Sequence, residues 1–275
     1  MNKEMVYSFS RLESFKTCEY GFYLTYVKKY KGEDNIYSFL GSEVHELLES
    51  MQVGKLDNNS ALEMFEEKVD DAEMLGYEFM SENVRNKYVE NVKNYIENFK
   101  PIECEDYGIE KEFLINVDNV KIKGFIDFYY INKEGKVEIV DYKTSSKFSA
   151  KDLPKKTRQL ILYGMALEEE GLEVEKVGFD MLKYYAKPWR NKMVLKERCE
   201  LPLDEFEHQE NRGFVFRDYN EEAKQDIKDY IKNTVDEINS KDFYDENDWQ
   251  PVVNCKNDFF CKNLCGHYKI CKYQK

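Results

Sequence analysis

The spacing of apolar residues along the chain changes near residue 109, and the change predicts a change of secondary structure. Before that point apolar side chains recur every three or four positions, which is the helical period. Capping boxes at Ser10 and Ser60 mark two helix starts. Helices are therefore expected over about 10–30, 39–51 and 60–99, and we interpret about 55–105 as a helical insertion.

After residue 109 apolar and polar residues alternate in short runs separated by turn residues, which is typical of strands. Strands are expected over 109–117, 120–131, 136–144, 176–186 and 193–201, and helices over 157–170, before Gly171, and 221–238. With no internal repeat or linker, the pattern predicts a single α/β domain over 1–275, with a central sheet and flanking helices.

Two neighbouring strands of this pattern carry candidate chemistry. Asp141 and Lys143 are two residues apart, so their side chains share one face of a strand, and the turn at Asn132–Gly135 can place Asp127 beside Asp141. Two carboxylates can hold a hard divalent cation, and a lysine can orient water or stabilise negative charge. This set suits metal-assisted phosphodiester hydrolysis, whereas an isolated D-x-K is more often part of a charged surface hairpin.

Two helices add polar residues with regular spacing. Gly41, His45 and Glu49 share one helix face, and Gln159 and Tyr163 share one face of the helix that follows the Asp141 strand. Either set alone is more typical of ordinary structure than of a site.

Composition restricts the partners. The net charge of −13 over 275 residues disfavours a nucleic-acid partner unless a cleft is locally basic, and the basic residues between 147 and 158 offer such a stretch. No apolar run is long enough to span a membrane and the N-terminus lacks a signal-peptide pattern, so no membrane partner and a cytoplasmic location are expected. In that compartment seven cysteines indicate thiols or metal ligands.

Taken together, these motifs resemble the PD-(D/E)XK nuclease superfamily, and its RecB-like branch with the AddB and CRISPR-associated Cas-four exonucleases in particular. The ordered set is His45, Glu110, Gly124-x-x-Asp127, Asp141-x-Lys143 and Gln159-x-x-x-Tyr163, within a resemblance that runs from about Tyr7 to Cys271. The resemblance implies a restriction-endonuclease-like core with a mixed central sheet.

The resemblance also implies roles for individual residues. His45, Asp127, Asp141 and the carbonyl of Tyr142 would bind Mg²⁺ or Mn²⁺, and Lys143 would be the catalytic lysine beside Asp127 and Asp141. Gln159 and Tyr163 would line the substrate groove. Whether Glu110 touches a metal stays open.

The cysteines form a second pattern. Iron–sulfur members of the branch use one cysteine in the first helix and three near the C-terminus, which here implies Cys18, Cys261, Cys265 and Cys271 in a segment of about 250–275 that closes onto the first helix. The Cys261-x3-Cys265 spacing and Glu19 after Cys18 depart from the usual family pattern. Four thiolates suit a [4Fe–4S] cluster or zinc, and the resemblance favours the cluster. Cys255 is a spare cysteine or the fourth ligand in place of Cys18.

The resulting hypothesis is a metal-dependent deoxyribonuclease, an exonuclease acting on DNA ends or single strands. No G-x-x-x-x-G-K-[ST] loop is present, so any unwinding would come from a partner such as a helicase, a recombination protein or a CRISPR-adaptation protein. The alternatives are a non-catalytic DNA-end-binding or assembly module, a CRISPR spacer-processing partner, and a zinc-stapled binding protein.

Overall fold

The computed structural model describes residues 6–190, 192–200, 212–252, 255 and 258–274. Two compact units can be distinguished. The first consists of 1–35, 112–125 and 221–275, and the second of 36–111 and 126–220. Each unit is described by itself below. The predicted strand end near Leu201 lies outside the described residues.

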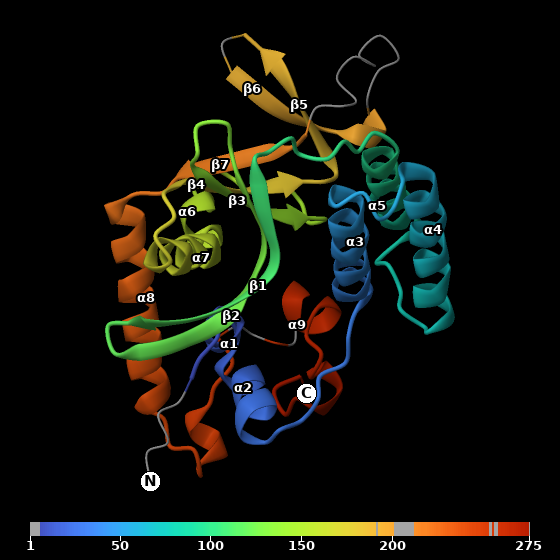
Figure 1. The fold of residues 1–275 in the computed structure, drawn as a ribbon. Coiled ribbons are helices and arrows are strands. Elements are labelled where there is room, and N and C mark those ends of the chain that lie inside the picture. The colour runs from blue at the N-terminus through green and yellow to red at the C-terminus, as the bar shows by residue number, and fades with distance from the viewer. Residues whose placement is uncertain (1–5, 191, 201–211, 253–254, 256–257, 275) are drawn as a thin grey trace. The chain divides into compact units, whose positions relative to one another are not determined.

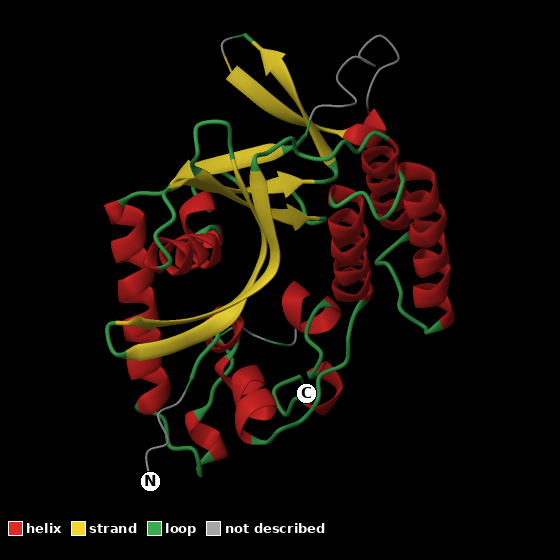
Figure 2. Ribbon diagram, viewed as in Figure 1, coloured by secondary structure: helices red, strands yellow, loops and turns green. Residues whose placement is uncertain are grey.

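The central sheet has five strands in the order β1-β2-β3-β4-β7. They are β1 (Asp106–Val117), β2 (Val120–Ile131), β3 (Val137–Lys143), β4 (Val174–Met181) and β7 (Phe214–Asp218). β2 and β3 are antiparallel, β3 and β4 parallel, and β4 and β7 antiparallel. The predicted mixed α/β fold is therefore confirmed (Figure 1 and Figure 2).

In the second unit, helices cover this sheet. The parallel β3–β4 connection is a helical crossover through α6 (Leu153–Lys156) and α7 (Arg158–Glu169), and α7 packs on both strands. Gly171 ends it with a φ of 88°, as the sequence predicted. A separate core joins α3 (Ile36–Gln52), α4 (Asn58–Met74) and α5 (Glu82–Glu97) to Tyr142 and Leu182. The predicted helical insertion is thus a pair of helices, α4 and α5.

The single strand predicted over 176–186 is wrong. The chain turns after Met181, and a separate two-stranded sheet follows, made of β5 (Tyr184–Trp189) and β6 (Lys192–Glu197), before a short 3-10 helix, η2 (Arg198–Glu200). The turn itself contains an apolar residue, the fully buried Leu182. The sequence pattern therefore gave no sign that the strand ends there. β7 was not predicted, because it is short and only half-buried.

The first unit is mainly helical. Its elements are α1 (Phe9–Thr17), α2 (Glu19–Phe22), the π-helix η1 (Tyr23–Val27), α8 (Glu221–Asn239), η4 (Glu246–Asp248), α9 (Phe259–Asn263) and η5 (Tyr268–Ile270). The helix predicted over 10–30 is wrong in one respect, because Cys18 is extended, with φ −161° and ψ 108°, and divides it. Trp249 is fully buried and stacks on Phe22 and Tyr23.

The predicted helix starts shift by two or three residues. The side chains that cap the helices are Ser8 before α1 and Asp57 before α4, rather than Ser10 and Ser60, and each accepts a backbone N–H of the first turn. Among the described residues, no helix combines the length and the apolar character needed to cross a membrane.

Candidate active site and a buried cysteine cluster

Asp127 and Asp141 are brought together by the β2–β3 hairpin. Asn132 organises its turn, because the side-chain oxygen accepts the backbone N–H groups of Glu134 and Lys136, each at 3.0 Å. The pairing Tyr129↔Ile139 fixes the register, and two further residues along each strand set Asp127 opposite Asp141. The charge of Asp141 also acts on Asp127, so the two carboxylates are near each other, and their role as metal ligands stays a prediction.

Asp141 is almost fully buried and only partly satisfied. Its Oδ2 lies 2.6 Å from Nζ of Lys143, while its Oδ1 has no hydrogen-bond partner among the described residues. A buried carboxylate oxygen without a partner is costly, because it has lost its water and gained nothing in exchange. The free oxygen is therefore fitted to accept a cation.

Lys143 is charged in this setting. Burial by itself lowers the pKa of Lys143, but Asp141 and Asp127 outweigh that effect, so the pKa is raised above its ordinary value. The ammonium group thus holds its proton at neutral pH and supplies a fixed positive charge beside the two aspartates.

His45 reaches the same place from α3. Its Nε2 lies 2.5 Å from the carbonyl oxygen of Tyr142 and 3.6 Å from Oδ1 of Asp141. Burial lowers the pKa of His45 more than Asp141 raises it, so the imidazole is neutral at pH 7, the state that binds metals. The histidine and carbonyl that the family resemblance pairs as ligands are therefore adjacent.

Glu49 is a member of this group that the sequence-based site did not include. It lies one turn beyond His45 on α3, and burial together with Glu110 and Glu46 raises its pKa to about 7. Burial, then Asp141, and then Glu110 and Glu49, raise the pKa of Asp127 to about 7 as well. The i, i+4 spacing of His45 and Glu49 was the available signal.

Glu110 has an unusual backbone. It lies within β1 with a φ of 48°, a left-handed value that is uncommon for a residue other than glycine. Such strain is often found at functional sites. The charge of Glu110 acts on Glu49, Asp127 and His45, so it belongs to the same cluster.

Gln159 and Tyr163 face the carboxylates from α7. Gln159 Nε2 donates a hydrogen bond to Oη of Tyr163 at 2.6 Å, so the two share one helix face as predicted. Burial, followed by the charges of Asp127 and Asp141, raises the pKa of Tyr163. The phenol therefore stays protonated beside the acidic cluster.

These donors fit a hard divalent cation. Within the described residues no three Asp, Glu, His or Cys side chains are arranged to hold an ion as they stand. Here Asp141 bonds Lys143, and His45 bonds the Tyr142 carbonyl. The unpartnered Oδ1 of Asp141 and the raised pKa of two nearby carboxyl groups both show an excess of negative charge. A cation would relieve both, and oxygen donors with one imidazole suit Mg²⁺ or Mn²⁺.

A second cluster, in the first unit, consists of thiols. Five cysteines line one small, almost wholly apolar cavity together with His267, and they are Cys18, Cys255, Cys261, Cys265 and Cys271. Cys18 thus lines the same cavity as the C-terminal cysteines, and their role as ligands stays a prediction. Cys104 and Cys199 do not line this cavity.

Three of these sulfurs receive backbone N–H groups. Gly21 N–H donates to Sγ of Cys18 at 3.3 Å, and the N–H groups of His267 and Tyr273 bond Cys265 and Cys271. Such bonds favour thiolates and oppose the effect of burial, which raises the pKa of each thiol. Cys261 instead bonds the thiol of Cys255, which adds to the effect of burial in raising its pKa.

His267 also leaves a polar atom unsatisfied at this cavity. The hydroxyl of Thr25 donates its one hydrogen to the carbonyl of Gly21 at 3.0 Å. Thr25 Oγ1 therefore acts as acceptor towards His267, whose Nε2–H donates to it at 2.7 Å. Nδ1 then carries a lone pair, and it is buried without a partner among the described residues. Thiols and an imidazole nitrogen are the donor types that an iron–sulfur or zinc centre uses, although no three of the described ones are arranged to hold an ion as they stand.

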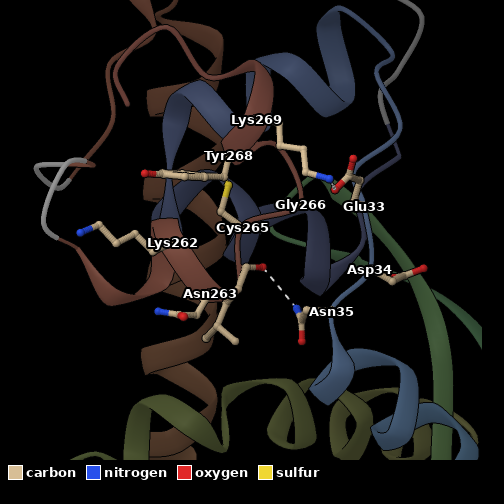
Figure 3. A pocket seen from close by; sticks show the side chains of 10 residues that line it. Glu33, Asp34, Asn35, Lys262, Asn263, Cys265, Gly266, Tyr268 and Lys269 are labelled. Atoms are coloured by element: carbon tan, nitrogen blue, oxygen red, sulfur yellow. Dashed lines mark hydrogen bonds and ion pairs between the residues drawn. The ribbon is translucent and has the colours of Figure 1, made fainter. Parts of the chain in front are cut away.

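A more open hollow adjoins the cysteine cluster (Figure 3). Glu33 and Lys269 form an ion pair across it at 2.7 Å, and both side chains are well exposed. Asn35 donates to the carbonyl of Leu264 at 3.4 Å. Cys265 lines both this hollow and the buried cavity, so it is the cluster thiol nearest to solvent.

Among known protein families, one has a model that matches almost the whole chain. Residues 6–272 match the family model of the PD-(D/E)XK nuclease superfamily. No curated protein matches the chain. Among solved structures, a crystal structure of SSO0001 is similar, with 17% identity over 97% of this chain and 96% of that chain and a TM-score of 0.33, a value at which the likeness supports no further conclusion. Because the family match covers nearly the whole chain and runs through both compact units, the chain belongs to the PD-(D/E)XK nuclease superfamily.

Proposed function

We propose that this protein is a metal-dependent deoxyribonuclease, and an exonuclease that acts on DNA ends or single strands. The observation that carries the proposal is the buried Asp141, which lies opposite Asp127 and beside the charged Lys143 with one oxygen unpartnered. Carboxylates and a lysine in this order suit phosphodiester hydrolysis. Membership of the superfamily supports nuclease activity, and the choice of DNA and of ends belongs to the proposal.

In the proposed site, Asp127, Asp141, His45 Nε2 and the Tyr142 carbonyl hold Mg²⁺ or Mn²⁺. The bound ion supplies Lewis-acid charge and a more acidic water. Lys143 stabilises the negative charge that develops on the phosphate, because its raised pKa keeps it protonated. Glu49 is proposed to accept a proton, because a carboxyl group whose pKa is raised to about 7 is basic enough to do so near neutral pH.

Gln159 and Tyr163 are proposed to position the substrate. Gln159 holds the phenol of Tyr163 in place, and the raised pKa of Tyr163 keeps its hydroxyl protonated near the scissile phosphate. A protonated hydroxyl orients a phosphate without adding to the negative charge already present.

The cysteine cluster is proposed to hold a [4Fe–4S] centre through Cys18, Cys261, Cys265 and Cys271. The N–H donors to three of these sulfurs support the ligand set. The thiol of Cys255 contacts both Cys261 and Cys271, so Cys255 can serve as the fourth ligand in place of Cys18. The centre would stabilise the first unit, because metal binding contributes directly to folding free energy. Since thiolate ligands persist in a reducing compartment, we propose a cytoplasmic location.

Incubation of the protein with end-labelled single-stranded and double-stranded DNA tests the proposal. With Mn²⁺ or Mg²⁺, labelled nucleotides should be released progressively from ends, and EDTA should stop the reaction. Fragments that appear first from internal positions would show an endonuclease. The absence of cleavage with every DNA and either metal would contradict the enzymatic proposal and favour a non-catalytic DNA-end-binding module.

A further inference from the structure

The β5–β6 hairpin has two chemically different faces. It is antiparallel, with the pairs Trp189↔Lys192, Lys187↔Val194 and Tyr185↔Lys196. Directly opposed residues share a face, and so do residues two apart along a strand. One face therefore carries Trp189 with the three lysines 187, 192 and 196, together with Val194 and the buried Tyr185, and we call it the lysine face. The other face carries Pro188, Met193, Ala186 and Leu195.

The charge of the hairpin is positive although the chain is acidic. Its only carboxylate, Glu197, bonds Lys87 at 3.1 Å, whereas Lys192 and Lys196 are exposed and form no ion pair with any described residue. The whole chain has a net charge of −13. A row of exposed ammonium groups in such a protein is complementary to a polyanion.

Trp189 adds a stacking surface to these charges. Its side chain is 59% exposed, next to Lys192 across the hairpin and before the exposed Arg190. Nucleic-acid bases stack on exposed aromatic rings of this kind. Only unpaired bases are available for stacking, so an aromatic ring with basic neighbours favours a single strand.

The hairpin begins beside the active site, within the same compact unit. Lys143 pairs with Met181 at the end of β4, and Leu182 N–H donates to the carbonyl of Lys143 at 3.0 Å. Four residues after Lys143, Lys147 Nζ bonds the carbonyl of Leu195 in β6 at 3.4 Å. The basic segment that follows the catalytic strand thus joins the hairpin. Figure 1 shows the hairpin standing out from the five-stranded sheet.

We propose that the lysine face of the β5–β6 hairpin binds single-stranded DNA next to the cleaved phosphodiester, with a base stacked on Trp189 and phosphates held by Lys192 and Lys196. The inference rests on the proposed nuclease function, which it deepens by naming the form of the substrate. It also explains how a strongly acidic protein retains a nucleic acid.

Intrinsic fluorescence tests this directly, because the chain has two tryptophans and the other, Trp249, is fully buried. Unlabelled oligo-dT on the order of ten nucleotides long, within the usual site size for single-strand binding, is titrated in EDTA so that no cleavage occurs. Wild-type fluorescence should be quenched, and Trp189→Phe should lose the quench while it still binds. Trp189→Ala should weaken binding about 5- to 100-fold, as expected for one lost stacked base.

Met193→Ala is the matched control, since Met193 is 60% exposed on the opposite face. It should leave affinity unchanged, whereas Lys192→Ala with Lys196→Ala should reduce the salt dependence of binding. The inference would be overturned if Trp189→Ala bound the single strand with wild-type affinity, or if Met193→Ala lost as much affinity as Trp189→Ala. It would also be overturned if binding of a blunt duplex depended on Trp189 to the same extent. Trp189-dependent binding without cleavage under any metal condition would instead reject the nuclease function and leave this surface standing.

Discussion

At the scale of single residues, the proposed active site is a cluster of carboxyl groups that also includes Glu110. Asp127 and Glu49 both have pKa values raised to about 7, while Asp141 is buried with one oxygen unpartnered. The chain therefore holds more negative charge in one place than burial favours. The excess is the physical reason to expect a cation there, and it is a property of the group rather than of any one residue.

The first prediction concerns pH. Because the folded-state pKa values of Asp127 and Glu49 lie above their ordinary values, the folded protein binds more protons than the unfolded chain between about pH 4 and 7. In EDTA, thermal stability should therefore fall as pH rises through that window. Asp127→Asn and Glu49→Gln should each flatten the fall, and Mn²⁺ should raise the melting temperature more at pH 8 than at pH 5.5. Equal slopes in wild type and both variants would contradict the clustering.

The second prediction concerns His45. An imidazole ligand shifts relative affinity towards first-row transition ions. Mn²⁺ should support cleavage at least as well as Mg²⁺, Ca²⁺ should bind without turnover, and His45→Ala should narrow the Mn²⁺ advantage more than it changes DNA binding. The measurement is a titration of each metal on both proteins, and an unchanged Mn²⁺ to Mg²⁺ activity ratio would make His45 a structural histidine.

Most of these residues were predictable from sequence. The D-x-K spacing and the hairpin turn indicated Asp127, Asp141 and Lys143, and the resemblance to the nuclease superfamily added His45. Glu49 was on the correct helix face but was not selected, since only the fold shows that this face meets Glu110 and Asp127. Residue spacing describes one element at a time, whereas a shared charge cluster depends on several.

At the scale of elements, local patterns predicted the interiors of helices and strands better than their ends. The β2 strand and the α8 helix lie where the pattern of apolar residues placed them. The first helix breaks at Cys18, whose sulfur accepts the Gly21 N–H and caps α2. Cysteine is not among the residues that usually cap helices. Neither capping patterns nor helical periodicity therefore predicted the break at Cys18.

A third prediction tests an element boundary. Gly171 ends α7 with a φ of 88°, and a Cβ there would meet no atom within 4 Å. Gly171→Ala should therefore cost about 1–2 kcal/mol of unfolding free energy, the strain of a left-handed alanine, through backbone conformation alone. Denaturant unfolding measures the loss, and cleavage per folded molecule should not change. Wild-type stability would mean that the turn relaxes without strain.

At the scale of the whole molecule, the chain divides its chemistry between two units. The carboxylate cluster lies in the second unit and the five-cysteine cavity in the first. Cys18 and the C-terminal cysteines are more than two hundred residues apart in sequence, yet they line one cavity. A bound centre at that place would connect distant parts of the chain, so its loss should affect stability more than local chemistry.

The fourth prediction concerns this centre. Protein purified without oxygen should be brown and contain iron and labile sulfide, and Cys18→Ser should lose both colour and thermal stability. Cys104→Ser is the control, because Cys104 lies outside the cavity, and it should keep the wild-type iron content. If Cys18→Ser keeps its full iron content, Cys255 is the fourth ligand. Zinc in place of iron would contradict the iron–sulfur proposal while leaving a metal centre.

The central claim is that Asp141 binds the cation for DNA cleavage, and the most direct test is the cleavage rate of Asp141→Asn on end-labelled single-stranded DNA with Mn²⁺. The substitution keeps the shape of the side chain and removes its charge. The rate should fall by at least about 10²-fold, as for the loss of a group that stabilises the transition state. DNA binding in EDTA should persist. A variant that folds, binds DNA and cleaves at the wild-type rate would contradict the account.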